Sequence, residues 1–574
     1  MRNSPRRQPA GIPAGGQYAP SVHAESSVGV GAGGTVLPGL MDLTPEAWAV
    51  LDACRDTGGR PLIVGGSVRD ALLSLETGEP VAFKDIDIEV HGTAPQALQE
   101  ALPGRVQEAG ASFGVLTTRI GGQDFDVSVP RRDSKTGEGH RGFEVELDPD
   151  ITLEEAFARR DYTMNSMGWD PYTGELIDPF GGRKDLEDRI LRHTREETFR
   201  DDPLRPLRAV QFAARFDLDI AQETIELCRS MKGSIAQLPK ERLWKEFNKL
   251  VTLGRRPSRG LEALYQTGIA ESFPALADVR GYPQDPLWHP EGAVDVHLGL
   301  SADAAAEAAE RDGAEPSERR VAVLATLLHD VGKAEHSQEG PDGCITSHGH
   351  AAGGVGPADE FLASIGAPNE VREKVLPLIR EHMRHISFDA APSASAVRRL
   401  MRDLAGENGN GPTITDWARV VDADLAGRGP GAKPPISGHW LQVTASVTAD
   451  PPILRGEDLA TAGIPRGQEW GWIVRASLAA QDEGLFTDTA GAVQWAKANR
   501  ESITAAEKPR WEAAKALREA MQQARIENSR AQARAEKARR NGLNDEAAEH
   551  DREAERFRAE MNWLKKEEEA VRRA

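Results

Sequence analysis

Residues 61–90, PLIVGGSVRDALLSLETGEPVAFKDIDIEV, form the stretch that decides the fold of the N-terminal part of this chain. An apolar run at 62–64 stops at two glycines and is followed by helical apolar spacing, so we predict a strand, a tight turn and a helix. Glycine lets backbone N–H groups approach a ligand closely, and a serine adds a hydroxyl group. The turn at Gly65, Gly66 and Ser67 is therefore suited to phosphate oxygens.

Asp85 and Asp87 follow in the segment KDIDIEV. Side chains two residues apart point to the same face of a strand, so the two carboxylates share one side. Neighbouring carboxylates repel each other unless a cation lies between them. Alone, a glycine pair is more often a simple turn and D-x-D a solvated edge. In this order, however, the two motifs predict a triphosphate site beside Mg²⁺ ligands, which is the equipment for nucleotidyl transfer.

GGSVRD followed by KDIDIEV resembles the head domain of the class II tRNA nucleotidyltransferase and bacterial poly(A) polymerase family. The resemblance implies an α/β nucleotidyltransferase head of the polymerase β superfamily, followed by an all-α neck, body, HD domain and tail. It assigns Arg69 and the glycine turn to the triphosphate. It also implies a third Mg²⁺ carboxylate on a neighbouring strand, at Asp126, with Asp124 on the same strand face as the alternative.

The segment RRDYTMNSM at 159–167 is similar to the family's RRDFTINAM. This similarity implies that Arg160, Asp161 and Asn165 bind the incoming nucleotide. Guanidinium groups suit phosphate, while Asp and Asn suit the ribose hydroxyls. Paired charges at a helix end are the alternative.

The segment FRDDPLRPLRAVQFAARF at 199–216 resembles the family's base-selecting helix with its E-D-x-x-R motif, and Asp201 stands where the family has glutamate. Spacing of three predicts Asp202 and Arg205 on one helix face. A carboxylate accepts from the exocyclic amine of cytosine or adenine, and Arg donates to ring acceptors, so the pair can select C and A. Arg208, one turn later, could stack on or frame the base. An ordinary ion pair on a structural helix is the alternative.

A set of histidines and aspartates is spread over several predicted helices beyond residue 283. Its members are His297, His329, Asp330, His350, His382 and Asp424. Imidazoles and carboxylates from several helices, with one adjacent His-Asp pair, are the ligand set of a divalent metal site. Each histidine alone would more simply be a capping or buried group.

WHPEG and ADLAGRGP flank this set, and they resemble the HD phosphohydrolase domain appended to some bacterial CCA-adding enzymes. The resemblance implies one metal held by His297, His329, Asp330 and Asp424, and a second brought by His350 and His382. His348 competes with His350, and we expect His289, His336 and His385 to be bystanders. The ion would be a divalent transition metal such as Ni²⁺ or Mn²⁺, and the activity that of a phosphatase or 2′,3′-cyclic phosphodiesterase.

A chain of 574 residues exceeds what one core usually serves, so several domains are expected. We predict a disordered leader at 1–42, the head at 43–180, a neck and body at 181–275, the HD domain at 276–430, a helical tail at 431–503 and a mostly exposed, charged helical extension at 504–574. No apolar run approaches the roughly 18 residues of a membrane span. Three scattered cysteines fit a reducing cytoplasm.

The net charge of −20 opposes binding to a polyanion. A basic segment at 240–259, KERLWKEFNKLVTLGRRPSR, could compensate locally, and a solvated helix with a basic cap is the alternative. The predicted function is CCA addition to tRNA from CTP and ATP, with no membrane partner. Its rivals are a poly(A) polymerase, an enzyme adding only CC or only A, and an HD phosphohydrolase with a non-catalytic RNA-binding head. The sequence leaves the oligomeric state and the HD metal open.

Overall fold

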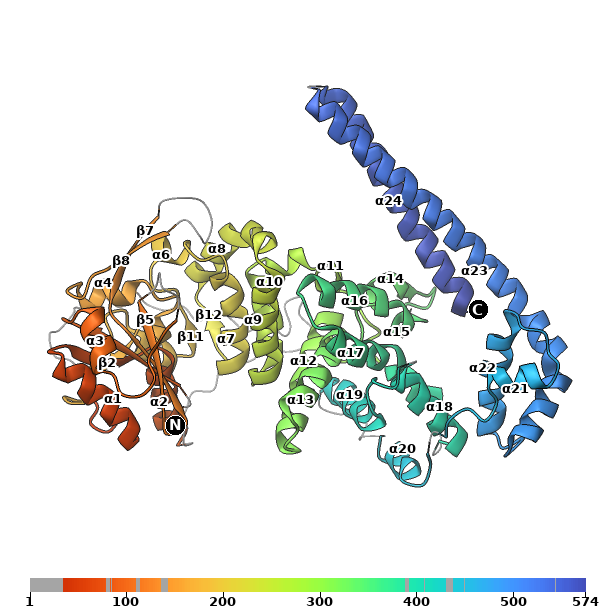
Figure 1. The fold of residues 1–574 in the computed structure, drawn as a ribbon, viewed down its shortest axis with the longest axis horizontal. Coiled ribbons are helices and arrows are strands. Elements are labelled where there is room, and N and C mark those ends of the chain that lie inside the picture. Colours follow the sequence, from red (N-terminus) through yellow and green to blue (C-terminus); the bar gives the residue numbers. More distant parts are fainter. Residues whose placement is uncertain are drawn as a thin grey trace. The chain divides into compact units, whose positions relative to one another are not determined.

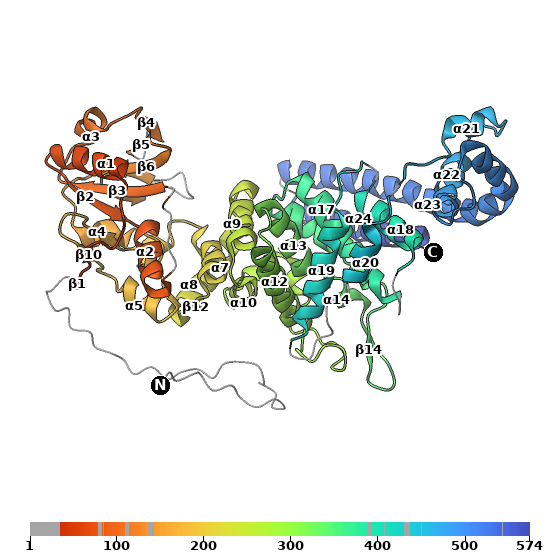
Figure 2. The ribbon, with the colours of Figure 1, turned by 90° about the horizontal axis from the view of Figure 1, so that it is seen from below.

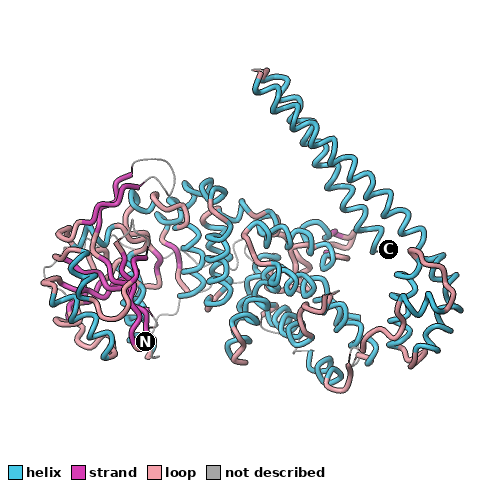
Figure 3. The backbone as a smooth tube through the Cα atoms, in the orientation of Figure 1, coloured by secondary structure: helices cyan, strands magenta, loops and turns pink. Residues whose placement is uncertain are grey.

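The structure of the protein is a computed structural model (Figure 1), and it describes residues 35–78, 83, 85–109, 114–135, 143–387, 392–406, 408–429, 437–448, 450–541 and 543–573. The chain divides into two compact units, one ending at Asp202 and the other beginning at Pro203. Strands gather in the first unit, and the described part of the second is almost entirely helical (Figure 3). The predicted α/β head followed by helical domains is confirmed.

A mixed eight-stranded sheet forms the first unit, in the order β1-β10-β9-β2-β3-β6-β5-β4. Its strands are β1 Thr35–Val36, β2 Arg60–Val64, β3 Asp85–His91, β4 Gln107–Ala109, β5 Val115–Ile120, β6 Gln123–Ser128, β9 Gly168–Trp169 and β10 Glu175–Ile177. The β3–β6 pair is parallel, and the other pairs are antiparallel. The strand that ends at the glycine turn and the strand that carries D-x-D are therefore neighbours.

Short helices and a two-stranded ribbon complete this unit. They are α1 Pro45–Asp56, α2 Gly66–Thr77, α3 Pro95–Ala101, α4 Leu153–Ala158, η1 Thr163–Asn165, α5 Gly182–Glu187 and α6 Glu196–Phe199, with β7 Arg131–Lys135 paired to β8 Phe143–Leu147, and β11 Ile190–Leu191. Thr44 caps α1 by accepting from the N–H of Ala47 at 3.1 Å. The strand, turn and helix predicted from residue 62 onward are confirmed by β2 and α2.

The predicted leader extends too far into the chain. Residues 1–34 lie outside the described residues, but Thr35–Val36 forms β1 and pairs with β10. Leu40 and Met41 are buried. Apolar side chains in this segment supply the burial that a disordered leader lacks. At the other end, the first unit continues to Asp202, beyond the predicted head boundary at residue 180.

The second unit is built from helices joined by short turns. In its first part they are α7 Arg205–Phe216, α8 Gln222–Met231, η2 Lys232–Gln237, α9 Lys240–Leu253, α10 Pro257–Gln266, η3 Ile269–Ser272 and α11 Pro274–Ala277. Then follow α12 Val294–Arg311, α13 Pro316–Leu328, α14 Lys333–His336, α15 His350–Gly353, α16 Val355–Ser364, α17 Asn369–Glu381, η4 His382–Ser387, α18 Ala394–Ala405 and α19 Ile414–Gly427. Short strands at β12 Asp219–Ile220, β13 Gln338–Glu339 and β14 Ile345–Thr346 were not predicted. Among the described residues, none of the helices has the length and apolar character needed to cross a membrane.

The C-terminal helices are α20 Ser437–Thr444, α21 Gly456–Thr461, α22 Glu469–Asp482, α23 Thr489–Arg540 and α24 Asn544–Arg573. Leu454, Leu459, Ile473 and Phe486 form a small core where α21, α22 and the start of α23 meet. The predicted tail boundary at 503 therefore falls inside one continuous helix.

Helices α23 and α24 lie side by side as a hairpin (Figures 1 and 2). The buried side chains are mostly alanines, at Ala514, Ala524, Ala531, Ala535, Ala538, Ala547 and Ala554. Arg534 pairs with Glu553 at 2.9 Å, and Arg539 pairs with Asp551. The extension is mostly exposed, as predicted, but it also packs on itself along this alanine seam. Its apolar stripe was missed because alanine contributes little to an apolar periodicity.

Candidate functional site

The glycine turn after β2 is the first part of the head site. Gly65 has φ 72° and ψ −128°, a conformation that residues with a side chain rarely adopt. A Cβ atom at this position would lie 2.7 Å from Nη1 of Arg160 and 3.7 Å from Oδ2 of Asp87. The hydroxyl of Ser67 donates to the carbonyl oxygen of Asp85 at 3.4 Å. The turn, the arginine and the acidic strand are therefore in contact.

The acidic residues lie on two parallel strands in register. Asp85 on β3 pairs with Asp124 on β6, and Asp87 pairs with Asp126. Registered residues of neighbouring strands point to the same face of a sheet, so these four side chains share one side. Ile86, Ile88, Phe125 and Val127 are buried on the opposite side. The alternation predicted from D-x-D is thus present in both strands.

Asp126 and Asp124 differ in their partners. Asp126 accepts a hydrogen bond from Oγ1 of Thr117 at 2.8 Å. Asp124 lies 3.5 Å from Nε of Arg119, and this pair is exposed. The charge of Asp126 acts on Asp87, the central member of the group. These contacts favour Asp126 over Asp124 as the third carboxylate.

The carboxylate of Asp87 is perturbed by its surroundings. Although Asp87 is exposed on β3, desolvation by the protein around it is the main cause that raises its pKa. The guanidinium of Arg160 opposes this shift, and the carboxylates of Asp126 and Asp85 add to it. Within the described residues, sets of three or more possible metal ligands with all ligand atoms within 4.8 Å of one another occur in the second unit. The three head carboxylates do not form such a set, so their oxygens are spread more widely, as expected for like charges that repel.

Arg69, Asn165 and Asp161 form a buried chain of hydrogen bonds. Nη1 of Arg69 donates to Oδ1 of Asn165 at 2.6 Å, and its Nε donates to Asp70 at 2.8 Å. The amide nitrogen of Asn165 donates to Oδ1 of Asp161 at 3.0 Å. A Cβ atom at Gly66 would lie 3.4 Å from Nη2 of Arg69. Arg69 is only 5% exposed, so its guanidinium holds Asn165 in place.

Glu89 belongs to this site and was missed by the sequence reasoning. It lies two residues beyond Asp87 on β3, and its Oε2 is 3.7 Å from Nη2 of Arg160. Its Oε1 is 3.0 Å from Nε2 of His91. Burial opposes ionisation of Glu89, but the hydrogen bond with His91 and the charge of Arg160 lower its pKa. The same period-two spacing that links Asp85 to Asp87 could have found it.

Asp202 and Arg205 do not lie on one helix. Helix α7 begins at Arg205, and Asp202 precedes it. A residue before proline is disfavoured in the helical conformation, and Asp202 is followed by Pro203. The prediction of a shared helix face is therefore wrong. Arg208 lies one turn along α7, with its guanidinium carbon 5.2 Å from the ring centroid of Phe212.

Four predicted metal ligands of the second unit converge from three helices. Nε2 of His297, on α12, lies 3.2 Å from Nε2 of His329 and 3.1 Å from Oδ1 of Asp424. Asp424 is on α19, and His329 and Asp330 follow α13 directly. Oδ2 of Asp330 lies 3.3 Å from Nε2 of His329. All four residues are at most 2% exposed.

A second group shares Asp330 with the first. Oδ1 of Asp330 lies 3.0 Å from Nε2 of His350 and 3.6 Å from Nε2 of His382. The two imidazole nitrogens are 3.3 Å apart. His348 is exposed and His350 is buried, so His350 is the member of this group. One carboxylate oxygen of Asp330 thus lies beside the first group of predicted metal ligands, and the other lies beside the second group.

The imidazoles are oriented as metal-binding histidines usually are. Nδ1 of His329, His350 and His382 lies 2.8, 2.6 and 2.7 Å from the main-chain oxygens of Thr326, Ser347 and Ile379. A carbonyl oxygen accepts, so each Nδ1 carries the proton and each Nε2 faces the group. Four imidazoles and two carboxylates are a donor set that fits divalent transition metals.

Protonation in this group is strongly perturbed. Despite burial, Lys333 and His329 hold the pKa of Asp330 well below its usual range. Burial lowers the pKa of His382 to about 4. Burial alone would also lower the pKa of His297, but the hydrogen bond with Asp424 and the close carboxylate of Glu291 raise it to about 9. A bound cation would displace the proton that His297 retains, while Asp330 and His382 are already in the state that a metal requires.

Close backbone packing fixes the second group. A Cβ atom at Gly332 would lie 2.2 Å from the carbonyl oxygen of His350 and 2.6 Å from the backbone nitrogen of Gly354. The glycine after Asp330 therefore lets the start of α14 touch α15. Gly332 lies two residues after Asp330, and its partner in this contact is the carbonyl oxygen of His350. The contact therefore sets the distance between Asp330 and His350.

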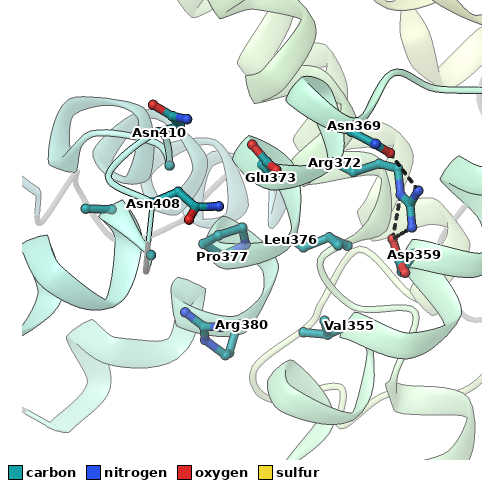
Figure 4. A pocket seen from close by; sticks show the side chains of 13 residues that line it. Val355, Asp359, Asn369, Arg372, Glu373, Leu376, Pro377, Arg380, Asn408 and Asn410 are labelled. Atoms are coloured by element: carbon teal, nitrogen blue, oxygen red, sulfur yellow. Dashed lines mark hydrogen bonds and ion pairs between the residues drawn. The ribbon is translucent and has the colours of Figure 1, made fainter. Parts of the chain in front are cut away.

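A separate pocket of about 450 Å³ lies beside α16 and α17 (Figure 4). Arg372 in its wall donates to Asp359 at 2.7 Å and to Asn369 at 3.1 Å. Arg380 donates to the backbone oxygen of Asp403 at 2.7 Å. None of the predicted site residues lines this pocket.

Three cations of the basic segment at 240–259 are paired with carboxylates of their own unit. Lys249 lies 3.0 Å from Glu246, and Arg256 lies 2.8 Å from Asp303. Arg259 lies 3.1 Å from Asp217 and 2.6 Å from Asp219. These pairs reduce the positive field that the sequence predicted there.

Three family models match the chain. The poly A polymerase head domain matches residues 62–192, the probable RNA and SrmB-binding site of polymerase A matches 217–279, and the HD domain matches 294–413. The first two ranges contain the glycine turn, the acidic strands and α9. The third contains five of the six predicted HD ligands, and Asp424 lies beyond it.

Curated relatives match over most of their own length. The multifunctional CCA protein of Xanthomonas campestris pv. campestris is 36% identical over 426 residues, which cover 73% of this chain and 97% of the relative. That of Aromatoleum aromaticum is 38% identical over 329 residues, or 56% of this chain and 74% of the relative. The CCA-adding enzyme of Bacillus stearothermophilus, solved in complex with CTP, has a TM-score of 0.53 and 22% identity, covering 80% of this chain and 99% of that one. This structural likeness shows a shared fold.

Proposed function

The chain belongs to the family of multifunctional CCA proteins, and on this premise we propose that it adds C and A to the 3′ end of tRNA from CTP and ATP. For its HD domain we propose a second, phosphohydrolase activity. The observation that carries the first activity is the contact of the glycine turn with Asp87 and Arg160 beside the parallel strands β3 and β6.

Asp85, Asp87 and Asp126 are the residues that would hold Mg²⁺. Their shared face and the raised pKa of Asp87 support this role, because crowded carboxylates are a donor set that divalent cations stabilise. When bound, Mg²⁺ supplies charge neutralisation and Lewis-acid activation for phosphoryl transfer.

The remaining head residues would bind and orient the nucleotide. The backbone N–H groups of Gly66 and Ser67, at the start of α2, would donate to the triphosphate. That of Gly65 donates instead to the carbonyl oxygen of Met167 at 3.0 Å. Arg160 would pair with phosphate oxygens. Asp161 and Asn165 accept from and donate to the ribose hydroxyls, and Arg69 fixes Asn165 through their 2.6 Å hydrogen bond. Fixing the nucleotide in this way aligns its α-phosphate with the RNA 3′-hydroxyl, which is a large part of the rate enhancement in such transfers.

Arg205 and Asp202 would select the base. Arg205 opens α7, so its guanidinium can donate to ring acceptors of cytosine or adenine. Asp202, in the turn before α7, would accept from the exocyclic amine. Arg208 would frame the base from the next turn, supported by its contact with Phe212.

His297, His329, Asp330 and Asp424 would hold one divalent transition metal such as Ni²⁺ or Mn²⁺. His350 and His382 would hold a second ion together with Asp330, whose two oxygens face the two groups. Metal ions in such centres supply Lewis-acid activation of a phosphate ester. We propose a phosphomonoester or 2′,3′-cyclic phosphate at a tRNA 3′ end as the substrate, because its removal leaves the hydroxyl that the head extends.

Residues 217–279, which match the RNA-binding family model, would contact the tRNA. Three free thiols, at Cys54, Cys228 and Cys344, support a reducing cytoplasmic location.

The test of the first activity offers labelled tRNA lacking its 3′ terminus with CTP, ATP or both. We expect addition of C from CTP and completion of CCA only when both are present. Long tails from ATP alone would instead identify a poly(A) polymerase. A product that stops after CC would identify an enzyme that adds only CC, and addition of A only to tRNA that already ends in CC would identify an enzyme that adds only A.

A rival from another class is a phosphohydrolase with a non-catalytic RNA-binding head. It predicts no incorporation from either nucleotide, together with hydrolysis of a phosphomonoester. The intact carboxylates of β3 and β6 and their contact with Arg160 favour the transferase over this rival.

A further inference from the structure

His297 is held differently from the other three imidazoles of the HD centre. His329 and His382 directly follow α13 and α17, where the last carbonyl oxygens of a helix have no partner within it. His350 begins α15, and its acceptor Ser347 precedes that helix. These three histidines can therefore use a main-chain oxygen three residues earlier as the acceptor for Nδ1.

His297 has no such acceptor because it lies inside a helix. Its own N–H donates to the carbonyl oxygen of Ala293 at 3.1 Å, and the carbonyl groups around it belong to the hydrogen-bond ladder of α12. Its Nδ1 instead lies 2.7 Å from Oε1 of Glu291. Glu291 is the acidic residue of the WHPEG motif, and its side chain is 4% exposed.

Glu291 also leads to the other side of the centre. The same oxygen lies 2.8 Å from Nδ1 of His289. Nε2 of His289 lies 3.2 Å from Nζ of Lys333, which lies 2.6 Å from Oδ2 of Asp330. Lys333 further donates to Gln284 at 2.6 Å. A continuous set of contacts thus joins Glu291 to His297 directly and to Asp330 through two side chains.

We propose that Glu291 is a positioning residue of the HD centre, which keeps the proton of His297 on Nδ1 and aims its Nε2 at the metal. This inference rests on the proposed metal-dependent function of the second unit. The inference extends that function by giving the WHPEG motif a role in positioning a metal ligand. In this role His289 is a coupling residue instead of a bystander. It also makes the two metal positions unequal, because among the four imidazole ligands only His297 has a side chain instead of a main-chain oxygen beside its Nδ1.

The experiment measures Ni²⁺ binding to the full chain by calorimetry after removal of metals. Excess Mg²⁺ is kept present to occupy the head carboxylates. Carboxylates suit Mg²⁺, whereas the imidazoles of the HD centre suit Ni²⁺. Wild type is compared with Glu291→Gln, with Glu291→Asp and with the control Glu339→Gln, whose side chain is exposed on β13. His350→Ala identifies which binding event belongs to the second group.

In Glu291→Gln we expect the event assigned to His297 to weaken by roughly 10- to 100-fold, as is typical when an outer-shell partner is removed. The event that His350→Ala abolishes should be unchanged, and so should both events in Glu339→Gln. Glu291→Asp retains the carboxylate and should lie between wild type and Glu291→Gln. It also serves as the test variant if Glu291→Gln does not fold.

Three results would overturn the inference. They are unchanged affinities in both Glu291 variants, equal weakening of both events, and loss of a whole ion from the stoichiometry, which would make Glu291 a direct ligand with His289. If wild type itself binds no Ni²⁺, it is the proposed metal centre that fails. A ligand-field spectrum of the Co²⁺ form that shifts in Glu291→Gln but not in Glu339→Gln would support the positioning role.

Discussion

Asp87 shows at the scale of one residue how like charge shapes the head site. Desolvation by the protein around it raises its pKa, Arg160 opposes the shift, and Asp126 and Asp85 reinforce it. A carboxyl group with a raised pKa in the folded state destabilises that state once the pH exceeds its folded pKa. The penalty is absent below the unfolded value of 3.8, where both states are protonated.

We therefore expect Asp87→Asn to stabilise the metal-free protein near neutral pH while abolishing nucleotide incorporation. Because Asp87 is exposed on β3, solvent screens the repulsion between the carboxylates, so we expect the gain in melting temperature to be small. The gain should shrink as the pH falls towards the usual carboxyl pKa. Calorimetry in a chelating buffer measures it, with the exposed Asp124→Asn as the control. A loss of stability near neutral pH would show that Asp87 is not under electrostatic strain.

Glu89 lies beside Nη2 of Arg160, whereas the glycine turn lies beside its Nη1. Glu89→Gln removes the negative charge 3.7 Å from that guanidinium. We expect kcat/KM for both nucleotides to fall about tenfold, equivalent to about 1.4 kcal/mol, mainly through KM because Arg160 would bind phosphate. Steady-state incorporation measures the split. Glu100→Gln, exposed on α3, is the matched control, and equal kinetics in the two variants would remove Glu89 from the site.

At the scale of elements, the turn between β2 and α2 is tightly constrained. Gly65→Ala combines a positive φ of 72° with a Cβ atom 2.7 Å from Arg160. We expect a cost of about 1–3 kcal/mol from the backbone and loss of most incorporation, because Arg160 must move. Gly78→Ala, at the end of the same helix, has φ 76° and open space around its Cβ.

The comparison of these two variants separates strain from displacement. Thermal unfolding and incorporation are measured for both. Gly78→Ala should lose stability and retain activity. Equal activity in the two variants would mean that the approach of the turn to Arg160 has no part in the reaction.

Sequence reasoning succeeded where the signal is local to one element. The glycine turn, the two-residue spacing of Asp85 and Asp87, and the cap at Thr44 each follow from neighbouring residues, and the structure contains all three. It failed at Asp202, where a spacing of three was taken for a helix face although Pro203 intervenes. Glu89 was missed although the same strand period reaches it.

Contacts between distant segments are harder to predict. No local pattern states that Glu291 reaches His297, or that Gly332 packs against His350. The hairpin of α23 and α24 was missed for a related reason, because its seam consists of alanines that pair only across a turn. Tertiary proximity, not residue type, decides all three.

At the scale of the whole molecule, the chain carries two candidate centres of different chemistry in two compact units. The head offers carboxylates, which suit Mg²⁺, and the second unit offers four imidazoles with two carboxylates, which suit transition metals. The net charge of −20 and the paired cations of 240–259 confine any RNA contact to local surfaces. Because the two centres lie in separate compact units, we infer that they act independently.

That claim is tested most directly by assaying one set of preparations for both activities. Wild type, Asp85→Ala and His329→Ala are each given labelled tRNA lacking its 3′ terminus with CTP and ATP, and separately a 2′,3′-cyclic phosphate. We predict that Asp85→Ala abolishes incorporation and retains hydrolysis, and that His329→Ala does the reverse. Loss of both activities in either folded variant, or incorporation that survives in Asp85→Ala, would contradict the account.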